Sequence, residues 1–242
     1  MMGSKEKIIK SKEELYSEEV IYTWDYEGAG QKYTNLAYWI LSIFSGGIPL
    51  LFLWSVTDMT VDSPVFFGLF ILTTTLVFIG RYLFAPDKHR CYHLTSMGIH
   101  YTEQDMIPEV AYKIARGFAW IGIVVCIIVA FMFGPLAFVG AGAFALMSFG
   151  MTNFQPTVDK SHIFIDERSV VFHIMNDGVV SFTIPEKGKL QYKGLVYTST
   201  LEERMELLTN LQSLFPEIEM VKIKRLNDQY KHPIYQQDET AE

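Results

Sequence analysis

The chain has 242 residues, of which 50% are hydrophobic and only 19% are charged, and its formal net charge is −7. An ordinary soluble domain has a larger charged share, so the apolar residues must be concentrated in particular segments. The acidic balance argues against nucleic acid as a partner. Cys91 lies between apolar runs and Cys126 inside one, which argues against a secreted domain held together by disulfides.

The first 35 residues are polar and carry charges of both signs. They lack the short apolar core and the small-residue cleavage site of a signal peptide. We therefore expect a cytosolic N-terminal segment over 1–35. Within it, residues 20–26 (VIYTWDY) alternate in polarity as a β-strand does.

Two apolar runs follow, over 36–57 and 65–85. A helix needs about 20 residues to cross the hydrocarbon core of a bilayer, and both runs meet that length. The loop between them carries Asp58 and Asp62 but no Lys or Arg, whereas basic residues flank the pair. Because loops rich in Lys and Arg stay in the cytoplasm, the sequence predicts a transmembrane hairpin over 36–85 with the N-terminus inside.

The segment 86–117 contains two short strand patterns, 91–95 and 99–102, separated by the turn residues Ser96, Met97 and Gly98. Two strands alone are marginally stable in water. We expect these cytosolic strands to join those of the C-terminal region in one sheet, which requires both segments to lie on the same side of the membrane.

The residues CYHLTSMGI, 91–99, resemble the first strand and turn of bacterial membrane proteins that carry a pleckstrin-homology-like domain, including the YcxB-like group. The resemblance implies a cytosolic scaffold or interaction domain beside paired membrane spans, and it brings no catalytic residues. This chain departs from the simple plan, because a second apolar run separates these strands from the remaining ones.

The second apolar region, 118–151, has no charged residue and would be about 50 Å long as one helix, too long for a single crossing. Gly134-Pro135 at its centre is a natural break. Basic residues on both flanks favour a second transmembrane hairpin over 118–151 that returns inside; a single kinked span and a re-entrant segment are the alternatives. Small residues form a stripe that predicts close helix packing: Gly134, Ala137, Ala141, Gly142 and Ala145.

After residue 151 the pattern changes to period two, which predicts a cytosolic β-rich domain over 152–226. Asn176-Asp177-Gly178 and 185–188 are turn signals between strands. Overlapping capping boxes at 199–203 begin a helix over 200–215. Its expected apolar stripe consists of Leu201, Met205, Leu208, Leu211 and Phe215. A short strand over 218–224 and a polar tail over 227–242 complete an α+β domain, an antiparallel sheet with one C-terminal amphipathic helix.

The histidines and one cysteine of the strand pair are the only visible metal-ligand candidates. His89, Cys91 and His93 alternate and so share a strand face, and His100 follows on the next strand. Such side chains bind zinc, but no standard zinc spacing is matched, and a strand edge exposed to water explains them as well. We predict no metal and no cofactor, and no spacing indicates a catalytic site.

These patterns predict a bacterial integral protein of the cytoplasmic membrane with four spans arranged as two hairpins and both termini in the cytoplasm. Its cytosolic domain would bind or scaffold. The alternatives are an accessory subunit of a transport or secretion complex and, third, a membrane enzyme or metal-binding protein. The expected partners are the lipid bilayer and a membrane protein or second copy of the chain, with no nucleic acid.

Overall fold

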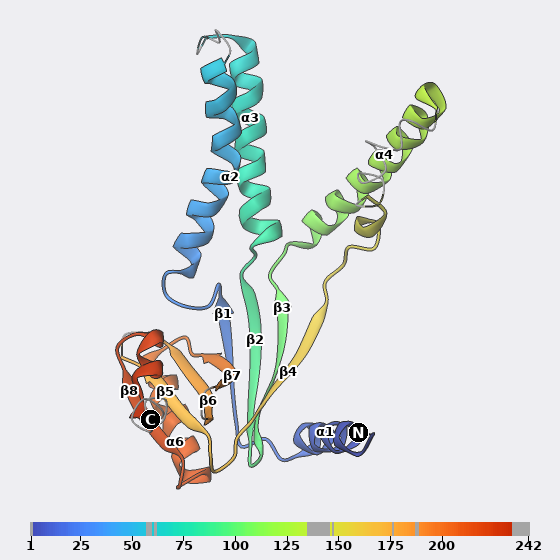
Figure 1. Ribbon diagram of the computed structural model, residues 1–242. Helices are drawn as coiled ribbons and strands as arrows, with labels where there is room; N and C mark the ends of the chain where they lie inside the picture. The colour runs from blue at the N-terminus through green and yellow to red at the C-terminus, as the bar shows by residue number, and fades with distance from the viewer. Residues whose placement is uncertain are drawn as a thin grey trace, which may run out of the picture. The chain divides into compact units, whose positions relative to one another are not determined.

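Residues 2–56, 60, 62–134, 146, 148–175, 177–186 and 189–233 are described in the computed structural model of the chain (Figure 1). The chain forms two compact units that alternate along the sequence. Unit 1 comprises Met1–Ile40, Asp87–Gln104 and Val158–Glu242. Unit 2 comprises Leu41–Pro86 and Asp105–Thr157, so it consists of two insertions into unit 1.

Sheet A of unit 1 has four strands in the order β1-β2-β3-β4 (Figure 1). They are β1 (Tyr22–Gly28), β2 (Lys88–Thr95), β3 (Gly98–Asp105) and β4 (Val158–Phe164). The β2–β3 turn depends on Gly98, which has φ +146°, and a Cβ there would lie 2.2 Å from the Ile163 carbonyl oxygen. The glycine of the quoted motif is therefore explained by the close approach of β4.

Sheet B has the order β7-β6-β5-β8. Its strands are β5 (Val170–Ile174), β6 (Val179–Glu186), β7 (Lys189–Tyr197) and β8 (Glu219–Ile223). The predicted α+β class with antiparallel sheets is confirmed, and so is the pairing of the 86–117 strands with a C-terminal strand, because β3 pairs with β4. The expectation of one sheet is wrong, because the strands after β4 form sheet B. β8 also pairs parallel to β5, because helix α6 (Leu201–Leu214) carries the chain back before β8 begins.

The main core of unit 1 is formed by side chains of both sheets and α6. Its members include Trp24 and Tyr92 of sheet A, Phe182 of sheet B, and Leu207 of α6. Trp24 stacks on Tyr92 with ring centroids 5.0 Å apart and donates from Nε1 to the Tyr197 carbonyl at 3.0 Å. Each fully buried large side chain contributes about 1.5–3 kcal/mol.

Helix α6 begins at the predicted capping box, formed by Thr200 and Glu203. The predicted apolar stripe is confirmed at Leu208, Leu211 and Phe215, which lie in or against the core. It is wrong at Leu201 and Met205, which are 63% and 54% exposed. The face that is buried contains Arg204, Leu207, Leu208 and Leu211. Arg204 is buried beside these leucines, and its guanidinium donates to the Ile174 and Asp177 carbonyls.

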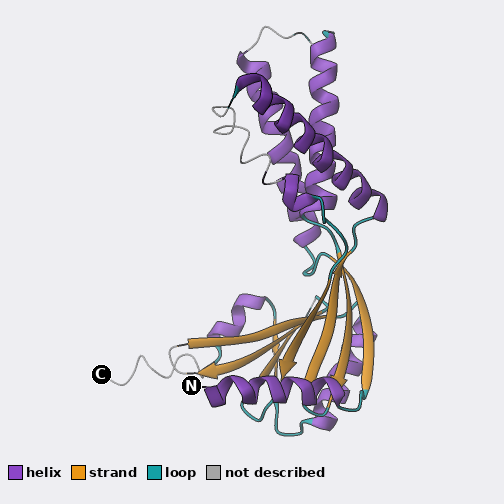
Figure 2. Cartoon of the chain, turned by 90° about the vertical axis from the view of Figure 1, so that its right-hand side faces the viewer, coloured by secondary structure: helices purple, strands orange, loops and turns teal. Residues whose placement is uncertain are grey.

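One face of each sheet contributes to the main core, and a helix covers the opposite face of each sheet. Helix α1 (Met2–Ser17), which was expected only as a polar segment, crosses the strands of sheet A (Figure 2). Its Tyr16 hydroxyl donates to the Ser161 carbonyl of β4 at 3.1 Å. On sheet B, the 3-10 helix η2 (Leu226–Lys231) lies over a smaller core that includes Phe172 and Ile223.

Unit 2 contains the apolar helices α2 (Thr34–Val56), α3 (Pro64–Ile79) with the π-helical turn η1 (Gly80–Phe84), and α4 (Glu109–Phe133). Three helical stretches among the described residues are long and apolar enough to cross a membrane: Thr34–Val56, Pro64–Phe84 and Glu109–Met132. α2 and α3 approach closely at Gly46, where a Cβ would lie 2.6 Å from Val77 Cγ2.

The predicted break at Gly134 is confirmed, because α4 ends at Phe133 and Gly134 has φ +73°. Beyond the break the chain comes back to the beginning of α4. The Phe154 ring lies 4.7 Å from that of Tyr112, and Arg116 Nη1 donates to the Phe154 carbonyl at 2.8 Å. Ala137, Ala141, Gly142 and Ala145, predicted to pack helices, lie outside the described residues.

Candidate functional site

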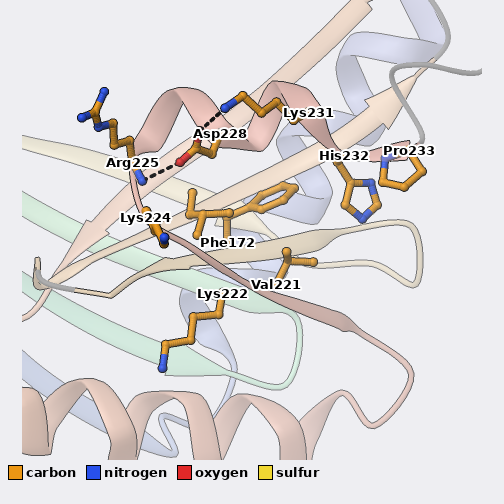
Figure 3. Close-up of a pocket in the computed structure, with 10 residues that line it drawn as sticks. Phe172, Val221, Lys222, Lys224, Arg225, Asp228, Lys231, His232 and Pro233 are labelled. Atoms are coloured by element: carbon orange, nitrogen blue, oxygen red, sulfur yellow. Dashed lines mark hydrogen bonds and ion pairs between the residues drawn. The ribbon is translucent and has the colours of Figure 1, made fainter.

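An open, basic cleft lies where β8 ends and η2 begins (Figure 3). Its volume is about 640 Å³. Four cations line it, Lys222, Lys224, Arg225 and Lys231, with Asp228 as the one acidic residue. All four cations are exposed. The floor is apolar and comes from Phe172, Val221 and Ile223. Figure 3 shows the side chain of Lys222 pointing away from Phe172 and η2, so Lys224, Arg225 and Lys231 form the cationic rim, above an apolar base.

Asp228 fixes the shape of the rim. One of its carboxylate oxygens accepts from the Arg225 backbone N–H at 3.0 Å, and the other lies 2.7 Å from Lys231 Nζ (Figure 3). The hydrogen bond from Lys231 and then that from Arg225 hold the pKa of the Asp228 carboxyl below its usual range. The single acid of the cleft stays ionised, and its charge is engaged within η2.

Helix η2 and His232, which follows it, are anchored to three strands of sheet B. The Ser181 hydroxyl of β6 donates to Gln229 Oε1 at 3.0 Å, and Gln229 is only 3% exposed. His232 Nε2 lies 3.0 Å from Glu219 Oε1 of β8, and its ring meets Phe172 of β5 edge-on at 5.6 Å. A polar residue buried with its partner fixes one position of η2, because an unpaired one would be costly.

Sequence reasoning missed this cleft. It read 218–224 as a plain last strand and 227–242 as a polar tail. The run Lys222-Ile223-Lys224-Arg225 is a local signal of positive charge. Its combination with Phe172, about 50 residues earlier in the chain, appears only when β8 pairs with β5.

The predicted metal candidates lie on the face of sheet A that α1 crosses. Cys91 Sγ is 3.6 Å from His93 Nε2, and the rings of His93 and His100 are 4.9 Å apart. His89 instead lies 4.0 Å from Glu27 of β1. The structure adds His162 of β4, the cross-strand partner of His100. We call the three neighbouring histidines, His93, His100 and His162, the histidine row.

Helix α1 covers the histidine row through Tyr16. The Tyr16 ring lies 4.8 Å from His100 and 6.4 Å from His162. Burial lowers the pKa of His100, and the neighbouring His93 lowers it further. Burial also lowers the pKa of His162, with a smaller contribution from Lys12 of α1. Both shifts favour the neutral form of His100 and His162.

The same face provides poor metal ligands at neutral pH. Burial, followed by a hydrogen bond to Asp25, raises the pKa of the Cys91 thiol to about 11, so the thiolate that binds metals is disfavoured. Among the described residues, no group of three or more His, Cys, Asp or Glu side chains lies so that it could hold a metal ion.

Unit 2 has a different kind of cavity. It has a volume of about 510 Å³ and an almost wholly apolar lining. Phe78 and Tyr82 come from α3 and η1, Ile114 and Phe118 from α4, and Met151 from the returning segment. This cavity is a seam between apolar helices, without the charged groups that orient a polar ligand.

An α+β body with a basic cleft, interrupted by two apolar helical insertions, defines the architectural class of the chain. The chain belongs to the TsiV2 immunity protein family, whose sequence model matches residues 2–242. It is 36% identical over 238 residues to a curated relative, "Immunity protein TsiV2" of Vibrio cholerae serotype O1 (strain ATCC 39315 / El Tor Inaba N16961). The match covers 98% of each chain. No solved structure matches.

Family membership corrects two predictions. The resemblance to proteins with a pleckstrin-homology-like domain, including the YcxB-like group, is wrong, because the immunity family accounts for nearly the whole chain. The short motif at 91–99 encodes a tight β-hairpin that many folds share, and the contact of Gly98 with β4 explains it. The predicted functions are wrong as well: the family is one of immunity proteins, not of membrane scaffolds, accessory transport subunits, or membrane enzymes and metal-binding proteins.

Proposed function

We propose that this chain is an immunity protein that protects the cell producing it by binding and neutralising a toxin, without catalysing a reaction. The observation that carries the proposal is the family match over residues 2–242, together with a curated immunity protein that aligns over 98% of both chains. The basic cleft supports a binding role, because it offers fixed cations around an apolar floor, the mixture typical of protein recognition.

A competition between sibling strains tests this function. The gene for the chain is deleted in its source strain, and the deletion strain is grown in contact with its parent. We expect the parent to kill the deletion strain and the full chain, supplied from a plasmid, to restore survival. The toxin is then identified as the parental gene whose loss abolishes killing. Equal survival of the deletion strain and the parent would overturn the proposal.

We also propose that the protein acts from the cytoplasmic membrane, as a multi-pass protein with both termini in the cytoplasm. Three helices have the required length and apolar composition, and most of their side chains are exposed, which suits a lipid environment. Basic residues flank both insertions on the predicted cytoplasmic side, which agrees with the distribution found in membrane proteins.

The register of sheet A supports two hairpins. Gly28 pairs with Lys88 across the first insertion, and Gln104 pairs with Val158 across the second. Each insertion therefore leaves and rejoins the same end of one sheet. A segment that enters a bilayer and returns to its starting side crosses an even number of times. The contacts of Phe154 with Tyr112 and Arg116 support the same return for the second insertion.

Reporter fusions test the topology. Alkaline phosphatase, active only outside the cytoplasm, is inserted after Ser63, between α2 and α3, and after Gly134, at the end of α4. Green fluorescent protein, fluorescent in the cytoplasm, is fused after residue 242. We expect all three reporters to be active. A C-terminal fusion that is produced but not fluorescent would contradict the second hairpin and would leave the immunity function untested by this experiment.

A further inference from the structure

The positive charge of the cleft contrasts with the rest of the chain. Lys222, Lys224, Arg225 and Lys231 gather at one edge of sheet B, while the whole chain has a formal net charge of −7. Because the strongest attraction between charged surfaces is local, an acidic ligand is drawn to this edge and repelled elsewhere. The opposite holds for a basic ligand.

The rim is rigid enough to select a ligand by shape. The Asp228 carboxylate accepts from the Arg225 backbone N–H and from Lys231 Nζ, so it fixes the backbone at Arg225 and the side chain of Lys231. The buried hydrogen bond between Ser181 and Gln229 holds η2 to the sheet. A backbone that is already fixed loses less conformational entropy when a partner binds.

The cleft also offers apolar surface to a ligand. Phe172 is fully buried beneath the cleft, and Val221 is partly exposed in it. β8 is the last strand of sheet B, so the cleft opens at a sheet edge where an extended peptide can lie. A segment that alternates acidic and apolar side chains presents one kind to the rim and the other to the floor.

We propose that the cleft between β8 and η2 is the docking site for an acidic, extended segment of the toxin. This inference rests on the proposed immunity function and adds the surface and the chemistry of the partner. A long polyanion such as nucleic acid fits less well, because beyond the cleft it meets an acidic protein surface. An anionic lipid surface also supplies negative charge, but it has no extended segment whose apolar side chains could contact the floor of the cleft.

The test reverses two rim charges in the full chain with Lys224→Glu/Arg225→Glu. The matched control is Lys10→Glu/Arg168→Glu, which changes the net charge equally at two cations whose side chains are 78% and 71% exposed. Affinity for the purified toxin, identified by the sibling competition, is measured for both variants and the wild type. We expect the rim variant to bind about 100-fold more weakly and the control to bind within about twofold of wild type.

Two further measurements keep the outcomes separate. Thermal unfolding of the rim variant must match that of wild type; if it does not, Lys224→Gln/Arg225→Gln replaces it, and about a tenfold loss is expected. Binding to vesicles containing phosphatidylglycerol is measured in parallel. Wild-type protection with an unchanged toxin affinity in the rim variant would overturn the docking site but not the immunity function. So would a rim variant that loses only vesicle binding.

Discussion

The two sheets of unit 1 are covered on their outer faces in different ways. Sheet A is covered by a helix whose Leu15 is fully buried and whose Tyr16 ring lies against His100 and His162, and burial favours the neutral form of both histidines. Sheet B is covered by a short 3-10 helix that is fixed by the buried Gln229 amide and by the hydrogen bonds of the Asp228 carboxylate. The first cover depends on neutral buried side chains and the second on an ionised carboxylate. We therefore expect the two faces to respond differently to mutation, pH and salt.

Phe172→Ala should produce the largest loss, because Phe172 forms both the small core of sheet B and the floor of the cleft. Truncation of a fully buried phenylalanine costs about 3–5 kcal/mol of the free energy of unfolding. Denaturant unfolding of the full chain in detergent micelles measures it. Phe172→Leu is the control, with an expected cost of about 1.5 kcal/mol or less. Equal stability of the alanine variant and wild type would show that the sheet B cover is not a packed core.

Tyr16→Ala should loosen only the cover of sheet A. It removes the ring that lies against His100 and His162 and the hydrogen bond to the Ser161 carbonyl, worth together about 1–3 kcal/mol. Hydrogen exchange should become faster in α1 while η2 is unaffected. Tyr16→Phe, which keeps the ring, separates the hydrogen bond from the packing. Protected α1 amides in the alanine variant would mean that other contacts hold the helix.

Lowering the pH should weaken sheet A more than sheet B. His100 and His162 have folded pKa values below the ordinary 6.5, so the unfolded chain binds protons first. Their contribution to stability is present above about 6.5 and is lost as the pH falls through the folded pKa. On sheet B, burial lowers the pKa of His173 in the same direction, with help from Arg204 and Lys222.

The pH comparison is made by thermal unfolding between about pH 8 and about pH 5.5. His100→Gln/His162→Gln should flatten the dependence more than His173→Gln does, because it removes two groups instead of one. Groups facing the row from α1 and β1, namely Lys12, Tyr16 and Thr23, remain in both variants. A wild type whose stability does not change over this range would contradict the lowered pKa values of His100 and His162.

We expect salt to have the smallest effect, and to affect the basic cleft of sheet B more than sheet A, the opposite of the pH effect. Raising NaCl from about 0.05 M to about 0.5 M screens exposed charges, so toxin association at the basic cleft should slow while the packing of α1 is little affected. Association rates measured by surface plasmon resonance, with the rim variant as reference, check this. A salt-independent association rate for wild type would separate the cleft from the toxin contact.

Local patterns of the sequence determined much of this protein. The apolar runs, the break at Gly134, the β2–β3 turn and the capping box at Thr200 each depend on neighbouring residues, and the structure contains all four. Length and hydrophobicity fix such features because helix rise, φ preference and hydrogen-bond capping act within a few residues. The predicted resemblance to proteins with a pleckstrin-homology-like domain, by contrast, was wrong, because it rested on nine residues whose glycine is explained by the β2–β3 turn.

Only the tertiary structure decided which distant residues meet. His162 joins His100 because β4 pairs with β3 across an insertion of more than fifty residues, and no local pattern encodes that register. Arg204 is buried on α6 because its guanidinium donates to the carbonyls of Ile174, at the end of β5, and Asp177, in the turn after it. The basic cleft exists because β8 pairs in parallel with β5, so the basic residues at the end of β8 and in η2 lie near Phe172. Charge and hydrophobicity are properties of the sequence, but a binding surface requires the sheet that brings them together.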